Sequence, residues 1–183
     1  AQTGTGKTAA FALPILQRLS AYASASASPA RHPVRALVLT PTRELAVQVA
    51  ESFRDYGKHV PLRSTVVYGG VDMNAQIAEL RKGVEVLVAT PGRLLDHVQN
   101  KTVMFNQVSI LVLDEADRML DMGFLPDIKR IIALLPGQRQ NLLFSATFPD
   151  EIRNLVKTLL RAPAEVQVAA RNAAAELVTH VLH

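Results

Sequence analysis

Residues 111–117 read LVLDEAD, an apolar run followed at once by three carboxylates. The run from Ile110 to Leu113 is short and apolar throughout, which is typical of a strand buried on both faces of a sheet. A carboxylate directly after such a strand lies at its carboxyl-terminal tip, which is where α/β proteins bind ligands. This stretch therefore predicts both a class of fold and the edge of the sheet that carries a site.

Working outward, apolar strands alternate with helical patterns along most of the chain. Strands are expected at 36–40, 64–68, 84–89, 110–113 and 141–144, and helical stretches at 9–19, 42–60, 74–81, 93–99, 124–135 and 150–160. This alternation predicts an α/β fold with a mainly parallel sheet flanked by helices. Right-handed crossovers then place all strand carboxyl ends along one edge. Residues 20–33 are expected to form a flexible surface loop without a site, and 163–168 a last strand.

The composition limits the classes of function. The chain has 183 residues, 49% of them hydrophobic, which suffices for a folded domain. It has no cysteine, which excludes a disulfide scaffold, a thiolate zinc site and a cysteine nucleophile. Its formal net charge of +4 permits a polyanionic partner without establishing one. No apolar run is long enough for a membrane span, so we expect no membrane partner and a cytoplasmic location.

Residues 1–8 read AQTGTGKT and fit a phosphate-binding loop, with Ala1 in its first position. Its glycines let backbone N–H groups point into one concavity at a helix start. Lys7 can then reach the β and γ phosphates, and the Thr8 hydroxyl can ligate Mg²⁺. The alternative is a Gly/Thr-rich turn with a surface lysine. The predicted nucleotide-binding residues are Thr3, Gly4, Thr5, Gly6, Lys7 and Thr8.

The carboxylates of 114–117 predict phosphate chemistry when taken with this loop. Asp114 would hold Mg²⁺ through its water shell, and Glu115 is placed to orient and deprotonate an attacking water. The alternative is an acidic helix start, since Asp and Glu favour a first turn. The pairing with Lys7 and Thr8 favours the catalytic interpretation.

Six motifs in this order resemble the first RecA-like domain of a DEAD-box ATP-dependent RNA helicase. They are AQTGTGKT at 1–8, PTRELA at 41–46, the glycine pair at 69–70, TPGR at 90–93, DEAD at 114–117 and SAT at 145–147. Residues 108–148, with Ala169, Arg171 and Asn172, look most like the bacterial RhlE group. The resemblance implies a three-layer RecA-like P-loop NTPase domain over 1–168, with ATP and Mg²⁺ as cofactors. Residues 169–183 would be an interdomain linker and the start of a second domain.

The resemblance also implies RNA contacts at three strand ends. A helix start beside Thr42 and Arg43 can bind phosphate through N–H groups and charge, although Thr42 can equally be a simple cap. The glycine pair lets a phosphodiester approach closely, or is merely a tight turn. Backbone contacts imply little sequence preference. The implied RNA-binding residues are Pro41, Thr42, Arg43, Gly69, Gly70, Thr90, Pro91, Gly92 and Arg93.

A coupling role follows from the resemblance for Ser145 and Thr147, whose hydroxyls would contact Glu115 and Asp117, the second and fourth positions of DEAD, and relay the nucleotide state to the RNA side. Capping of the next helix is the alternative. Two sets of residues are expected to be structural. Met119, Leu120, Met122 and Phe124 would pack in the core or between domains. Surface positions without metal-ligand spacing are expected for His32, His59, His97, His180 and His183.

Some segments of the family pattern lie outside residues 1–183. They are the strand that feeds the phosphate loop, the glutamine motif that reads adenine, and a second RecA-like domain with arginine fingers. We therefore expect an incomplete piece of a longer enzyme that is nearly inactive by itself. Two alternatives stay open: a DNA-directed helicase domain on the same scaffold, and a non-catalytic phosphate- or RNA-binding fragment.

Overall fold

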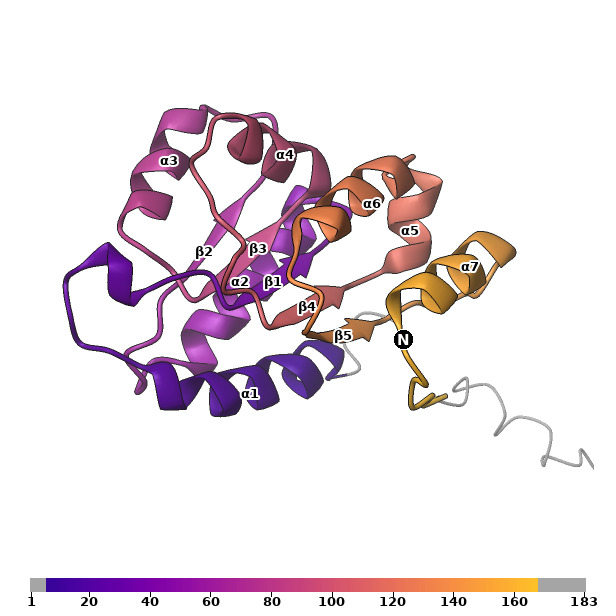
Figure 1. Cartoon of the computed structure of the whole chain (residues 1–183), viewed down its shortest axis with the longest axis horizontal. Helices are drawn as coiled ribbons and strands as arrows, with labels where there is room; N and C mark the ends of the chain where they lie inside the picture. Colours follow the sequence, from indigo (N-terminus) through magenta and orange to yellow (C-terminus); the bar gives the residue numbers. More distant parts are fainter. Residues whose placement is uncertain (1–5, 168–183) are drawn as a thin grey trace, which may run out of the picture.

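Five parallel strands form one sheet in the order β2-β3-β1-β4-β5 (Figure 1). The computed structural model describes residues 6–167. Every neighbouring pair of strands is parallel, and the pairs keep one register along the sheet. The bounds are Ala36–Leu39 for β1, Ser64–Val67 for β2, Val86–Ala89 for β3, Ile110–Leu113 for β4 and Gln140–Leu143 for β5. The predicted parallel α/β sheet is confirmed.

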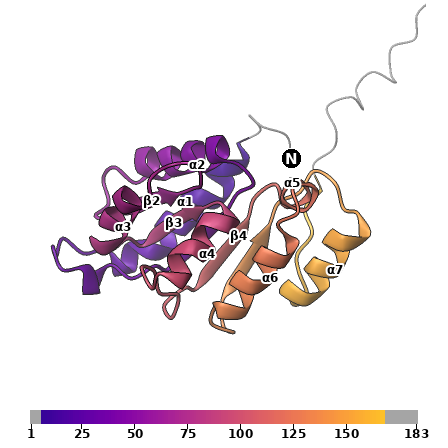
Figure 2. The ribbon, with the colours of Figure 1, turned by 90° about the horizontal axis from the view of Figure 1, so that it is seen from above.

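Helices cover both faces of the sheet, which makes three layers. On one face lie α1 (Lys7–Leu19) and α2 (Arg43–Tyr56), as Figure 2 shows. The other face carries α3 (Met73–Arg81), α4 (Pro91–Gln99), α5 (Ala116–Asp121), α6 (Leu125–Leu134) and α7 (Asp150–Leu159). No helix within residues 6–167 is long and apolar enough to cross a membrane.

The central strands are buried on both faces, as their unbroken apolar runs predict. In β1, Leu37 and Leu39 point into the core under α4 to α7, whereas Ala36 and Val38 point into the core under α1 and α2. This alternation follows from the two-residue period of a strand. A strand with two buried faces needs apolar side chains at every position.

Residues 20–31 lie at the surface as expected, whereas the expected surface position is wrong for two of the histidines. Short 3-10 helices, η1 (Ser20–Tyr22) and η2 (Pro29–Arg31), form within the expected loop, and His32 after them is only 1% exposed. His97 is fully buried as well, while His59 is exposed as expected. Both buried rings have hydrogen-bond partners for their nitrogens, which removes the cost of burying them. His180 and His183 lie outside the described residues.

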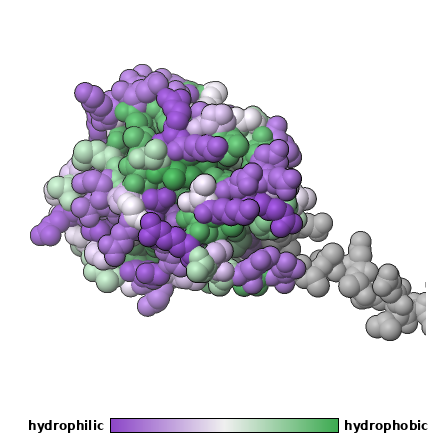
Figure 3. Space-filling model, turned by 45° about the vertical axis from the view of Figure 1, so that its right-hand side comes forward, coloured by the Kyte–Doolittle hydropathy of each residue, from purple (hydrophilic) through white to green (hydrophobic). Residues whose placement is uncertain are grey.

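The sheet ends at β5, and the expected strand at 163–168 is absent over the described residues 163–167. Gln140 is exposed and the rest of β5 is only half-buried, whereas β4 beside it is fully buried. A segment can become a strand only where a neighbour offers hydrogen bonds, and 163–167 pair with none. Figure 3 brings this side of the molecule forward and shows hydrophobic surface among hydrophilic side chains.

The expected packing of residues 119–124 is found only in part. Met119 is fully buried, and Leu120 and Phe124 pack against the core of the α4 to α7 face. Met122 is 48% exposed and therefore does not belong to the core.

Candidate functional site

The predicted site residues gather along the carboxyl edge of the sheet. The in-register pairing of Val67, Ala89, Leu39, Leu113 and Leu143 aligns the last residues of all five strands. The segments that leave these ends therefore lie side by side. They include 40–43, 68–71, 90–93, 114–117 and 144–147.

Lys7 at the start of α1 contacts the carboxylates that follow β4. Its Nζ lies 2.8 Å from Asp114 Oδ1 and 3.9 Å from Glu115 Oε1, and its side chain is only 7% exposed. Gly6 before it has a φ of 75°, a left-handed conformation that glycine adopts without strain. The chain thus brings together residues that are far apart in sequence. Thr3, Gly4 and Thr5 lie outside the described residues.

Asp114 is fully buried and only partly satisfied. Burial raises the pKa of its carboxyl, and the Lys7 ammonium opposes that rise. Oδ1 faces Lys7, but Oδ2 has no hydrogen-bond partner within residues 6–167. A buried acceptor without a partner costs about 1–3 kcal/mol, so its retention suggests a ligand.

The donor set here fits a hydrated magnesium ion. Mg²⁺ usually keeps several waters and takes one or two carboxylates together with substrate phosphates. The orphaned Asp114 Oδ2 is one such carboxylate oxygen, and Thr8 follows Lys7 in the first turn of α1. No cluster of three or more His, Cys, Asp or Glu side chains able to cage a metal occurs in the part of the chain that the structure describes.

Glu115 is held in a strained backbone conformation. Its φ of 53° is left-handed, which is uncommon for a residue with a side chain. Its carboxylate lies between two cations, with Lys7 on one side and Arg118 Nη1 at 3.4 Å on the other. Strain of this kind costs of order 1–3 kcal/mol and clusters at functional sites.

Asp117 bridges the segments that follow β4 and β5. Its Oδ2 accepts hydrogen bonds from Thr147 Oγ1 at 2.9 Å and from the Thr147 N–H at 3.0 Å. The Asp117 N–H donates to Ser145 Oγ. Partial burial pushes the pKa of Asp117 up, but the bonds from Thr147, the Arg118 N–H and Ser145 outweigh it, so the pKa lies below its usual value. The three predicted coupling residues are therefore in contact.

The corner after β1 combines a helix cap with an exposed cation. Thr42 Oγ1 accepts a hydrogen bond from the Leu45 N–H, so the capping interpretation is correct for this side chain. Arg43 is exposed, and its guanidinium lies 4.8 Å from the centre of the Tyr68 ring at the end of β2. Arg43 thereby links two of the three corners.

The glycine corner after β2 is open on its outer side. Gly69 and Gly70 are exposed, and a Cβ added at either would have no atom within 4 Å. Gly70 has a φ of 79°, which a side chain would strain. The turn therefore leaves room for a ligand to approach the backbone.

Arg93 faces inward. Its side chain is 11% exposed, Nη2 donates to Val71 O at 3.0 Å and Nη1 to Gln76 Oε1 at 3.2 Å. In this conformation Arg93 supports the turn after Gly70. A direct contact between Arg93 and RNA stays a prediction.

Gln76 and His97 are the polar residues that sequence reasoning missed. Gln76 on α3 donates to Tyr68 O at 2.9 Å, and its Oε1 accepts from Arg93 and from His97 Nε2 at 3.1 Å. His97 Nδ1 contacts Thr102 Oγ1. Burial and then Arg93 lower the pKa of His97, which keeps the ring neutral. The sequence does indicate that Gln76 is buried, because it stands four residues before buried Leu80 and so lies on the same helix face.

Comparison with known proteins decides the family. The family model described as DEAD/DEAH box helicase matches residues 1–155. The chain belongs to the DEAD/DEAH box helicase family. Among relatives of this family, the DEAD-box ATP-dependent RNA helicase CshA of Bacillus cereus is 46% identical over 171 residues, which are 93% of this chain and 31% of that protein. RhpA of Helicobacter pylori is 46% identical over 172 residues, or 94% and 33% of the two chains.

A solved structure supports the same fold. The crystal structure of a hypothetical ATP-dependent RNA helicase from Sulfolobus tokodaii matches with a TM-score of 0.77 and 42% identity. The match covers 88% of this chain and 44% of that one. The chain spans about a third of the length of the curated relatives named above.

Proposed function

We propose that this chain is the ATP-binding domain of an RNA helicase that couples ATP binding and hydrolysis to RNA clamping and local duplex unwinding. One observation carries the proposal: Lys7, Asp114 and Glu115 converge beside three strand-end corners on a single edge of the sheet. Phosphate chemistry and backbone binding would therefore occur next to each other. The names of the relatives support the same activity.

At the nucleotide, the Lys7 ammonium would move from Asp114 to the β and γ phosphates, since an anionic phosphate competes directly with a carboxylate for it. Thr8 and Asp114 would hold Mg²⁺, which when bound neutralises charge on the phosphates. Glu115 would accept the proton of the attacking water, from a carboxylate that lies 3.9 Å from Lys7 Nζ. Asp117, with Ser145 and Thr147, would report the nucleotide state to the RNA corners.

At the RNA, the helix starts beside Thr42 and Thr90 would bind phosphates with their N–H groups, and Arg43 would add an exposed charge. Pro41, Pro91 and Gly92 shape these starts, while Gly69 and Gly70 let the strand approach. Contacts of this kind give little sequence preference, with a log–log salt slope of about −0.7 for each neutralised phosphate.

The remaining parts of the proposal concern the longer protein. A second RecA-like domain would supply arginine fingers and half of the RNA site, so residues 1–183 alone would turn over ATP very slowly. We also propose the bacterial RhlE group as the nearer grouping, on residues 108–148 and 169–172, although the relatives reported above carry the names CshA and RhpA. A cytoplasmic location belongs to the same proposal.

The decisive experiment measures ATP turnover of the full-length protein with single-stranded RNA and with DNA of the same sequence. We expect stimulation by RNA alone, and a DNA response of equal size would favour the DNA-directed alternative. In a Glu115→Gln variant, turnover should fall by at least about a hundredfold while ATP binding persists. Undiminished turnover in that variant would refute the role of Glu115 as general base.

A further inference from the structure

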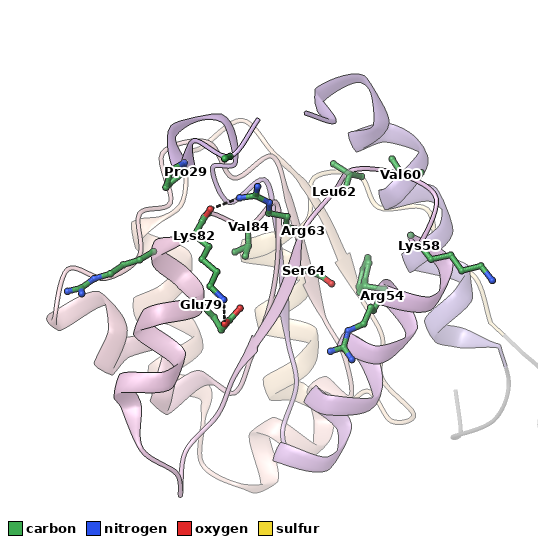
Figure 4. A pocket seen from close by; sticks show the side chains of 15 residues that line it. Pro29, Arg54, Lys58, Val60, Leu62, Arg63, Ser64, Glu79, Lys82 and Val84 are labelled. Carbon is green, nitrogen blue, oxygen red and sulfur yellow. Dashed lines mark hydrogen bonds and ion pairs between the residues drawn. The ribbon is translucent and has the colours of Figure 1, made fainter. Parts of the chain in front are cut away.

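A basic cavity lies at the opposite end of the sheet from the site above. It has a volume of about 720 Å³ and opens at the start of β2, between the carboxyl ends of α2 and α3 (Figure 4). Ser64, the first residue of β2, lines it together with Leu62 and Arg63. Since the phosphate and RNA residues follow the strand ends, this cavity belongs to neither set. We call it the β2 groove.

Positive charge gathers around the β2 groove. Five basic residues and one acidic residue line it, and that acidic residue, Glu79, is paired with Lys82 on the same helix. Arg54, Lys58 and Arg81 have no carboxylate partner within 4 Å among residues 6–167. The whole chain has a formal net charge of only +4, so a large part of its excess lies here. Such a surface attracts an anionic partner.

The groove contains an open strand edge. β2 is the outermost strand, and only β3 pairs with it. Val86 N donates to Arg63 O and Thr90 N donates to Val67 O, so the odd-numbered residues of β2 face β3. By the alternation of a strand, the N–H and C=O groups of Ser64 and Val66 face outward. In Figure 4 the strand that begins at Ser64 runs between the helix that carries Arg54 and the helix that carries Glu79.

The rim of the groove is fixed before any partner binds. Arg63 donates from Nη1 to Lys82 O and from Nη2 to Ser26 O, so its charge is oriented without being neutralised. Below it, the buried Glu85 carboxylate accepts from the Arg63 N–H and contacts the His32 ring. A preorganised rim reduces the entropy that binding must overcome.

We propose that the β2 groove docks an extended acidic segment of a partner protein, which adds to β2 as a further strand. The outward N–H and C=O groups of β2 would give main-chain hydrogen bonds to the partner segment. The basic rim would select acidic side chains, and the apolar Val60, Leu62 and Val84 would contact the side chains that alternate with them. RNA fits less well, because it offers no strand to β2 and the only aromatic residue of the lining, Phe53, is buried.

The test uses the full-length protein and a fluorescein-labelled ten-residue peptide of alternating glutamate and valine. Fluorescence anisotropy should show saturable binding that weakens with salt. The same peptide N-methylated at every residue keeps the charge but offers no N–H to β2, and it should bind at least about tenfold more weakly. Equal binding of the two peptides would overturn strand addition.

Variants locate the binding. The double variant Arg54→Glu with Arg81→Glu should bind the glutamate–valine peptide about tenfold or more weakly, since two attractive contacts become repulsive. Lys157→Glu on α7 makes the same kind of charge change at an exposed site away from the groove and should leave binding unchanged. Ser64→Pro removes an outward N–H at the first residue of an edge strand, where proline is tolerated. This variant should also bind the peptide more weakly.

Two further outcomes would overturn the proposal. One is that the groove variants bind the peptide as well as the unaltered protein. The other is that they bind single-stranded RNA less well while peptide binding is unchanged, which would assign the groove to nucleic acid. RNA-stimulated ATP turnover should be the same in all variants, because none of the altered residues lies at the carboxyl edge of the sheet.

Discussion

Replacing Gln76 by alanine should loosen the glycine corner without touching the nucleotide residues. The side chain makes three hydrogen bonds: it donates to Tyr68 O, and it accepts from Arg93 Nη1 and His97 Nε2. Tyr68 immediately precedes the glycine pair and Arg93 holds Val71 after it. The amide of Gln76 therefore fixes both ends of the turn.

The magnitude follows from the groups that lose a partner. A buried donor or acceptor left unsatisfied costs about 1–3 kcal/mol. Gln76 is 8% exposed and the Arg93 side chain 11%, so water can enter the space and the lower figure applies. Three groups then give a loss of about 3 kcal/mol in the free energy of unfolding. With an m-value of about 2 kcal/mol per molar urea, the midpoint moves down by about 1.5 M.

Urea unfolding of the protein measures this loss, and binding of fluorescent single-stranded RNA well below the midpoint measures its effect on the corner. We expect RNA affinity to fall about tenfold while ATP affinity is unchanged, because the turn must become ordered when RNA binds. Gln48→Ala on the exposed face of α2 is the matched control and should change neither quantity. A Gln76→Ala protein with a midpoint shift below about 0.3 M, or with full RNA affinity, would show that the network does not position the corner.

Three further predictions follow from buried polar groups and from one close contact. Burial lowers the pKa of His97 from its ordinary 6.5, so below that pH the unfolded chain binds more protons than the folded one. The free energy of unfolding should therefore fall as the pH drops from 7 to 5. A His97→Gln variant whose stability falls with the same slope would contradict the assignment of that slope to His97. Lys7→Met should lower the free energy of unfolding by about 3 kcal/mol at pH 8. The loss should shrink as the pH falls toward 4, because the pKa of Asp114 is raised and a protonated Asp114 leaves no unpaired charge. An equal loss at pH 8 and pH 4 in thermal unfolding would refute the pairing. Gly83→Ala should lower the free energy of unfolding by more than about 2 kcal/mol, because φ is 81° and the new Cβ would lie 2.8 Å from Pro29 O. An unchanged melting temperature would contradict this close contact between Gly83 and Pro29.

The sequence predicts the strands well because their signal is local. An apolar run such as 110–113 needs no distant information to indicate a strand with two buried faces, and the structure has the same bounds. Helix ends are less well predicted. The expected helix 42–60 ends at Tyr56, since Gly57 begins a turn and a Cβ there would lie 2.8 Å from Phe53 O. The sequence does not predict helix α5, because six residues are too few to show a helical repeat of apolar side chains.

The buried histidines could not be predicted because their partners are distant in sequence. His32 contacts Glu85, 53 residues later, and His97 contacts Gln76, 21 residues earlier. An isolated histidine in a polar stretch carries no mark of such a partner. The same holds for Arg93, whose TPGR motif predicts a charged donor facing a ligand, whereas its guanidinium holds a neighbouring loop in this structure.

The unsatisfied polar atoms of the domain explain how a ligand would stabilise it. Within residues 6–167, the buried side-chain atoms without hydrogen bonds belong to Asp114, Arg93 and Arg35. The Arg35 guanidinium stacks on the Tyr22 ring at 3.9 Å, so its flat face is occupied. Asp114 and Arg93 both follow strand ends, at the edge where Glu115 is strained as well. A ligand that contacts the buried Asp114 carboxylate offsets the cost of burying it, so stability should rise with the concentration of ATP and Mg²⁺.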